Sequence, residues 1–211
     1  MPIPITFYVN EAIGVEAVQS LCGELESAGF GLSFTEYPNR PAAALEWLLP
    51  TGVVFFMAKK YLETLAEAAA KDHYPAIKSF ITEKIQPRFI GPDAEKMVMM
   101  MPGGNVKDTG PFSRTFSVST KVSNSLMSIE VKLLFKENTE PEELTEGLSA
   151  FSKLFSQHEE GELMEKLIAM DQGRSWAKVV WFNPESKAIE LIDAVQSGKE
   201  KRLVSKSVER T

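Results

Sequence analysis

The apolar run Val53–Met57 (VVFFM) constrains the fold of this chain more than any other stretch. Gly52 precedes the run, and Lys59 and Lys60 follow it closely. A continuous apolar run of this length, rich in β-branched and aromatic residues, is typical of a strand that is buried on both faces. A helical pattern begins almost at once after the run. We therefore expect an interior strand here, in a sheet with helices packed on each side.

Strand and helix patterns alternate through the first part of the chain. The expected elements are, in order, a strand at residues 3–9, a helix at 11–27, a strand at 30–34, a short helix that starts at Asn39 with Pro41 in its first turn, the central strand, and a helix that begins near Lys59 and either kinks or restarts at Pro75. Strands that alternate with connecting helices are typical of a parallel sheet with right-handed connections. Residues 1–87 are therefore predicted to form a βαβαβα unit with parallel strands.

The pattern changes after Pro87. The expected elements are a strand at residues 96–101, a hairpin of strands 116–122 and 127–135, a helix that begins near Thr139 and breaks at Gly161, and a hairpin of strands 177–182 and 187–192. The hairpin strands alternate apolar and polar residues, as in a sheet with one face in water. Residues 88–194 are therefore predicted to form an antiparallel sheet with one long helix. The fold class is then α/β to α+β, and whether the two parts share one sheet is left open.

The last segment, residues 195–211, carries several basic residues and no apolar period. Such a pattern is typical of a polar chain end that is exposed to solvent. We therefore expect a basic tail that contributes nothing to the core.

Composition and charge exclude several classes of protein. The net charge of −6 over 211 residues argues against a nucleic-acid binder, which needs a basic surface. The apolar segment 42–58 contains Glu46 and is interrupted by Pro50 and Gly52, so it does not fit a membrane span. The lone Cys22 lies on the apolar stripe of an expected helix and is interpreted as a buried thiol. Without a signal-peptide pattern at the start, a cytoplasmic location is expected.

The motifs that could carry catalysis or bind a metal or nucleotide are weak. The triplet 108–110 (DTG) resembles the one around an aspartic-protease carboxylate, but Lys107 and Pro111 depart from that pattern, so it is interpreted as a surface turn. The glycine pair at 29–31 leads from a helix into a strand, the wrong order for a phosphate-binding loop. His73 and His158 have no further ligands at a suitable spacing. The sequence predicts no catalytic residue, metal or cofactor.

One candidate ligand site follows from the expected topology alone. In an open parallel sheet, ligands bind beyond the carboxyl ends of the strands. The residues expected there after strands one to three are Asn10, Glu11, Glu36, Tyr37, Lys59, Lys60 and Tyr61. A carboxylate near a lysine is suited to acid–base work, and a tyrosine can orient a substrate.

A second candidate surface is the expected strand at residues 96–101. Met97, Met99 and Met101 lie on one side of it, and flexible thioethers suit an interface that tolerates imperfect shape. We expect these methionines at an interface with a second copy or a protein partner.

Two functional hypotheses from different classes follow. The first is a non-catalytic interaction or regulatory domain that binds another protein or itself, because the chain lacks catalytic motifs and offers one-sided strands. The alternative is a small enzyme or ligand-binding domain that uses a pocket at the carboxyl ends of strands one to three. The sequence favours the first.

Overall fold

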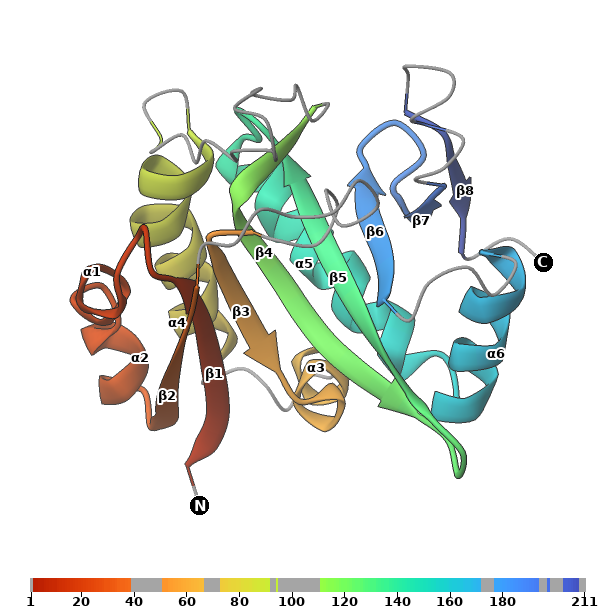
Figure 1. Cartoon of the computed structure of the whole chain (residues 1–211), viewed down its shortest axis with the longest axis horizontal. Coiled ribbons are helices and arrows are strands. Elements are labelled where there is room, and N and C mark those ends of the chain that lie inside the picture. Colours follow the sequence, from red (N-terminus) through yellow and green to blue (C-terminus); the bar gives the residue numbers. More distant parts are fainter. Residues whose placement is uncertain are drawn as a thin grey trace.

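The computed structural model describes residues 2–38, 51–66, 73–91, 94, 111–171, 177–193, 197 and 203–208. These residues form a mixed α/β structure around one eight-stranded sheet (Figure 1). The strands are β1 (Ile3–Asn10), β2 (Phe30–Tyr37), β3 (Val53–Met57), β4 (Phe112–Ser123), β5 (Ser128–Lys136), β6 (Ala177–Asn183), β7 (Ala188–Ile192) and β8 (Ser205–Ser207). Their order across the sheet is β2-β1-β3-β4-β5-β6-β7-β8. Strands from both parts of the sequence therefore share one sheet.

Two of the helical segments carry a proline in their first turn. The helical segments are α1 (Val15–Gln19), α2 (Gly23–Ser27), α3 (Lys59–Ala66), α4 (Tyr74–Ser79), the π-helix η3 (Phe80–Ile90), α5 (Pro141–Ser156) and α6 (Glu160–Met170). Pro75 and Pro141 lie in the first turns of α4 and α5, where a missing backbone N–H has no cost. The restart at Pro75 is confirmed.

The strand directions correct the predicted parallel unit. β1 runs parallel to β2, as expected, but antiparallel to β3, so that Val9 lies opposite Val53. β3 is instead parallel to β4 on its other side. An apolar run shows that a strand is interior, but it carries no information on direction, because side chains alternate between faces in the same way in both orientations. Val53–Met57 is confirmed as an interior strand.

The second part of the chain also differs from the prediction. The β4–β5 and β6–β7 hairpins are antiparallel, as expected, whereas β5 and β6 are parallel. The connection between them contains two helices, α5 and α6, where one long helix with a break at Gly161 was expected; Gly161 instead lies inside α6. A crossover connection carries the chain back to the end of the sheet where the preceding strand began. The strand after the crossover therefore runs parallel to the strand before it.

The single helix predicted at 11–27 is divided into α1 and α2. Gly14, which precedes α1, has a φ of 80°, a conformation that residues with a side chain rarely adopt. α1 ends at Gln19, with Ser20 as its C-cap, and α2 begins at Gly23. Glycines at both helix starts, together with the break at Ser20, produce two short helices that still bury Val18 and Leu25.

The helices described here all contribute to one apolar core on a single face of the sheet. In Figure 1, α4 and α5 lie behind the strands. Phe7, Phe55 and Phe116 of the sheet are fully buried against η3 and α5, with ring centroids of Phe7 and Phe80 5.8 Å apart. We call this side the helix face. The expected packing of helices on each side is found, within the described ranges, on this side alone.

The opposite face of the sheet carries polar side chains and a small apolar cluster. The cluster is formed by Phe112, Leu134, Val179, Trp181 and Ile192. The described part of the last segment belongs to the structure rather than to a solvated tail, because β8 pairs with β7 and Val208 is fully buried. Val208 and Leu203, which packs against the small cluster, are too few to produce a visible apolar period in the sequence.

Candidate functional site

The predicted ligand residues at the ends of β1 and β2 come together. The backbone N–H of Glu11 donates to the carbonyl of Tyr37 over 3.0 Å, and the N–H of Asn10 donates to the carbonyl of Gly52 over 2.7 Å. Burial raises the pKa of the Tyr37 phenol to about 12, although a hydrogen bond with the Asn10 side chain opposes this. Glu11 and Glu36 are exposed beside this pair. This end of the sheet therefore holds a buried amide and a partly buried phenol with two carboxylates at the rim.

The predicted residues after β3 lie at the opposite end of the sheet. Because β3 is antiparallel to β1, its last residue, Met57, lies opposite Ile5. The Tyr61 ring packs edge-on against Phe30, the first residue of β2, with centroids 5.7 Å apart. Lys59 forms an ion pair of 2.6 Å with Glu63 on the same helix. The structure therefore separates Lys59, Lys60 and Tyr61 from the other four predicted residues by the length of the strands.

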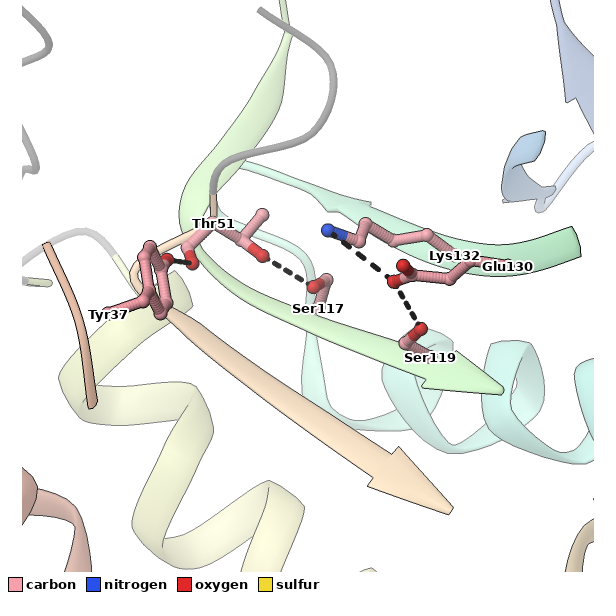
Figure 2. Close-up of polar contacts among 6 residues, drawn as sticks. All are labelled: Tyr37, Thr51, Ser117, Ser119, Glu130 and Lys132. Atoms are coloured by element: carbon pink, nitrogen blue, oxygen red, sulfur yellow. Dashed lines mark hydrogen bonds and ion pairs between the residues drawn. The ribbon is translucent and has the colours of Figure 1, made fainter. Parts of the chain in front are cut away.

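A row of polar side chains runs from Tyr37 across the centre of the sheet (Figure 2). The Tyr37 hydroxyl donates to the carbonyl of Thr51, and the Thr51 hydroxyl lies 2.6 Å from the hydroxyl of Ser117. Ser117 is fully buried, and so is Ser119, two residues further along β4. These hydroxyls come from β2, the start of β3 and β4, so only the assembled sheet brings them together. We call Tyr37, Thr51, Ser117, Ser119, Glu130 and Lys132 the polar row.

The polar row continues onto β5, where Lys132 and Glu130 lie on the same face. The Lys132 amine is 3.8 Å from a Glu130 oxygen, and the same oxygen accepts a hydrogen bond of 2.6 Å from Ser119. Lys132 is 4% exposed. Burial lowers the pKa of the Lys132 amine, and the negative charge of Glu130 opposes this in part. A desolvated lysine beside a carboxylate and two hydroxyls is suited to bind an anion or to exchange a proton.

Sequence reasoning missed the β4 and β5 members of this row. Ser117, Ser119, Glu130 and Lys132 alternate with apolar residues, which predicted a face in water. The structure buries three of the four. A lysine opposite a serine on neighbouring strands is also common on exposed sheet faces. No signal in the sequence therefore distinguishes a buried polar row from an exposed one.

An open groove of about 500 Å³ lies on the outer side of α5. Its lining comes from α5, the start of α4 and the β6–β7 hairpin: Tyr74, Thr145, Glu146, Ser149, Ala150, Lys153, Gln157, Phe182 and Lys187. Lys187 and Glu146 form an ion pair of 2.5 Å across it. The groove is open and its lining mixes polar and apolar surface in similar amounts, whereas small-molecule pockets are largely apolar and enclosed.

The tip of the β4–β5 hairpin carries the two large apolar side chains that are exposed in the described part of the chain, Leu126 at 90% and Met127 at 51%. The turn around them is well ordered by hydrogen bonds. The Asn124 side-chain oxygen accepts from the backbone N–H groups of Leu126 and Met127, each over 2.9 Å, and the Asn124 N–H donates to the carbonyl of Met127. Figure 1 shows the hairpin extending beyond the neighbouring strands.

Several sequence predictions concern other positions. Met97, Met99, Met101, the 108–110 triplet and the helix expected from Asn39 lie outside the described residues. Cys22 is fully buried, and burial, with the nearby Glu26 charge, raises the pKa of its thiol to about 12, which makes it a poor nucleophile. Among the described helices, none is both long and apolar enough to cross a membrane.

Comparisons with protein-family models, with curated proteins and with solved structures find no significant match to this chain. Arguments about function therefore rest on the geometry of the chain itself.

Proposed function

We propose that this chain is a non-catalytic interaction domain that inserts the tip of its β4–β5 hairpin into an apolar pocket on a protein partner. The observation that carries the proposal is the exposure of Leu126, at 90%, beside Met127. Large apolar side chains that project together from a folded surface mark an interaction site. A protruding pair is suited to a concave apolar pocket rather than to a flat surface.

The order of the turn strengthens the proposal. Three hydrogen bonds that involve Asn124 hold the turn in one conformation before any partner binds. A preordered loop loses little conformational entropy on binding, so more of the contact energy appears as affinity. Met127 adds a flexible thioether that can adapt to the walls of the pocket.

The test compares three versions of the whole chain: the natural chain, the double variant Leu126→Ser, Met127→Ser, and the control Ser125→Ala. Ser125 is exposed in the same turn, so its substitution alters the tip without removing apolar surface. Proteins captured from native cells are identified by mass spectrometry, and each candidate partner is then purified and titrated. We expect one partner to bind the natural chain and the control equally and the double variant at least tenfold more weakly.

Equal binding of all three versions would contradict the proposal. The double variant should also melt within a few degrees of the natural chain, because neither side chain is in the core. That measurement separates loss of binding from loss of folding.

A second candidate function, a ligand-binding domain or small enzyme, is supported by the lowered pKa of Lys132 in the polar row. We propose a small anion as its ligand, bound through the Lys132 amine, because the Ser119 hydroxyl already donates to Glu130 and the Ser117 hydroxyl is paired with Thr51. Thermal shifts with a panel of small carboxylates and phosphates test it. A ligand that stabilises the natural chain and Lys121→Met, but not Lys132→Met, is expected; Lys121 lies on β4 in the same face but is exposed. Equal shifts in all three would rule it out.

A further inference from the structure

The two edges of the sheet differ in how they are protected from pairing with another strand. β8 has only three residues, with the exposed Lys206 at its centre. Shortness and a central lysine are both devices that prevent edge-to-edge association. β2, at the other edge, has eight residues, pairs in an unbroken register with β1 and contains neither proline nor lysine. Within the described residues, β1 is its only neighbour in the sheet.

The outward-pointing backbone groups of β2 can be assigned from one hydrogen bond. The Tyr37 carbonyl accepts from the Glu11 N–H, so the backbone groups of Tyr37 point toward β1. Because the N–H and C=O of successive strand residues point to alternate sides, the odd-numbered residues of β2 pair with β1. The residues whose backbone groups point outward are therefore Phe30, Leu32, Phe34 and Glu36.

We infer that this edge pairs with β2 of a second copy of the chain, antiparallel and around a two-fold axis at Ser33. In this register Phe30 lies opposite Glu36 of the second copy, and Leu32 lies opposite Phe34. All four outward-pointing residues then exchange both backbone hydrogen bonds, about eight bonds in total. A two-fold axis uses the same edge on both copies, so the association closes at a dimer.

Charge and side-chain size fit this partner. Glu36 is the single charged residue of β2, and the two-fold register places it away from Glu36 of the second copy. At the axis the two Ser33 side chains form a non-hydrogen-bonded pair, the closer of the two antiparallel pair types, where small side chains fit best. Leu32 and Phe34 are only partly buried at this edge, and the added strand would cover their exposed sides.

The inference does not rest on the hairpin proposal. The β4–β5 tip and β2 lie on different sides of the molecule in Figure 1, so a variant at one site leaves the other intact.

The experiment places a cysteine at the predicted axis of the whole chain. In Ser33→Cys the two thiols would lie on residues with Cα atoms about 4.5 Å apart, within disulfide range. The matched control is Thr35→Cys, exposed on the same strand and face, whose two Cα atoms would be about 14 Å apart because of the four-residue stagger and the spacing between strands. Native Cys22 is fully buried and is retained.

Under mild oxidation we expect a covalent dimer from Ser33→Cys and none from Thr35→Cys or the natural chain. Sedimentation of the natural chain should show a dimer, and Glu36→Pro should be monomeric with unchanged folding, because proline removes an outward-pointing N–H and no bond to β1. A monomeric natural chain, equal cross-linking of both cysteine variants, or a dimer that survives Glu36→Pro would each overturn the inference.

Discussion

Neighbouring residues of β3 show how different the two faces of the sheet are. Phe55 points to the helix face, is fully buried and contacts the rings of Phe7, Phe80 and Phe116. Phe56 points to the opposite face, is only half-buried and packs edge-on against Tyr8. The sequence shows two equivalent phenylalanines. The difference shows that the free energy of unfolding lost when either phenylalanine is removed depends on how deeply the fold buries it.

Two buried lysines extend the comparison. Lys178 lies on the helix face, and its amine forms an ion pair of 2.5 Å with Asp171 at the end of α6. Lys132 lies on the opposite face, and its amine is 3.8 Å from Glu130, which also accepts from Ser119. A close ion pair at a helix C-terminus is favourable, because the helix dipole and the carboxylate both attract the ammonium group. Lys132 has a looser pair, and burial lowers the pKa of its amine.

The largest expected change in stability comes from substituting the two phenylalanines. Phe55→Ala should lower the free energy of unfolding by about 3–5 kcal/mol, the usual range for a fully buried phenylalanine. Phe56→Ala should lower it by about 1–2 kcal/mol, because less apolar area leaves water on folding. Urea denaturation of both variants measures the difference. Equal losses would mean that the two faces are equally well packed.

The next effect concerns the lysine partners. Asp171→Asn should destabilise the fold by about 3 kcal/mol, because it leaves the buried Lys178 charge with weaker compensation. Glu130→Gln should cost less, because Lys132 can release its proton when its partner is neutralised. Denaturation at neutral pH compares the two. A larger loss of stability in Glu130→Gln than in Asp171→Asn would show that the Lys132–Glu130 pair is the more important of the two.

A smaller effect appears in the pH dependence. The pKa of Lys132 is lowered from 10.5 in the folded state, so between the folded pKa and 10.5 the unfolded chain binds more protons. The contribution of Lys132 to the free energy of unfolding therefore rises as the pH increases toward 10.5. Lys132→Met should lack this rise, whereas the control Lys121→Met should keep it. Thermal melts of the three chains from pH 7 upward make the comparison, and parallel curves would contradict it.

The smallest effect concerns Glu190, on the opposite face beside Trp181. Burial tends to raise the pKa of its carboxyl, but hydrogen bonds from Ser205, Asn183 and Ser186 outweigh this and lower it below 4.5. The contribution of the Glu190 carboxylate to the free energy of unfolding is present above pH 4.5 and is lost as the pH falls through the folded pKa. Glu190→Gln should cost less than about 1 kcal/mol at pH 7, because solvent screens a partly exposed group.

Acid titration of the melting temperature checks this last prediction. The difference in melting temperature between Glu190→Gln and the natural chain should disappear at low pH. A constant gap would show that the carboxylate charge plays no part.

The mixed α/β class, the interior position of Val53–Met57, the restart at Pro75 and both hairpins follow from the sequence, because each depends on local periodicity or on a proline. The candidate site was predicted less well. Locating strand ends predicted that Asn10 and Tyr37 lie together, whereas Lys59 was placed at the wrong end because the direction of β3 was unknown.

The sequence by itself determined most of the strands and helices, apart from β8 and the division of the helix at 11–27, because local structure depends on neighbours within a few positions. Only the tertiary structure decided that β3 runs antiparallel to β1, that Lys132 is buried beside Ser119, and that β2 forms a long edge. These features arise from contacts between residues far apart in the chain. A pattern with a period of two or 3.6 residues contains no record of such contacts.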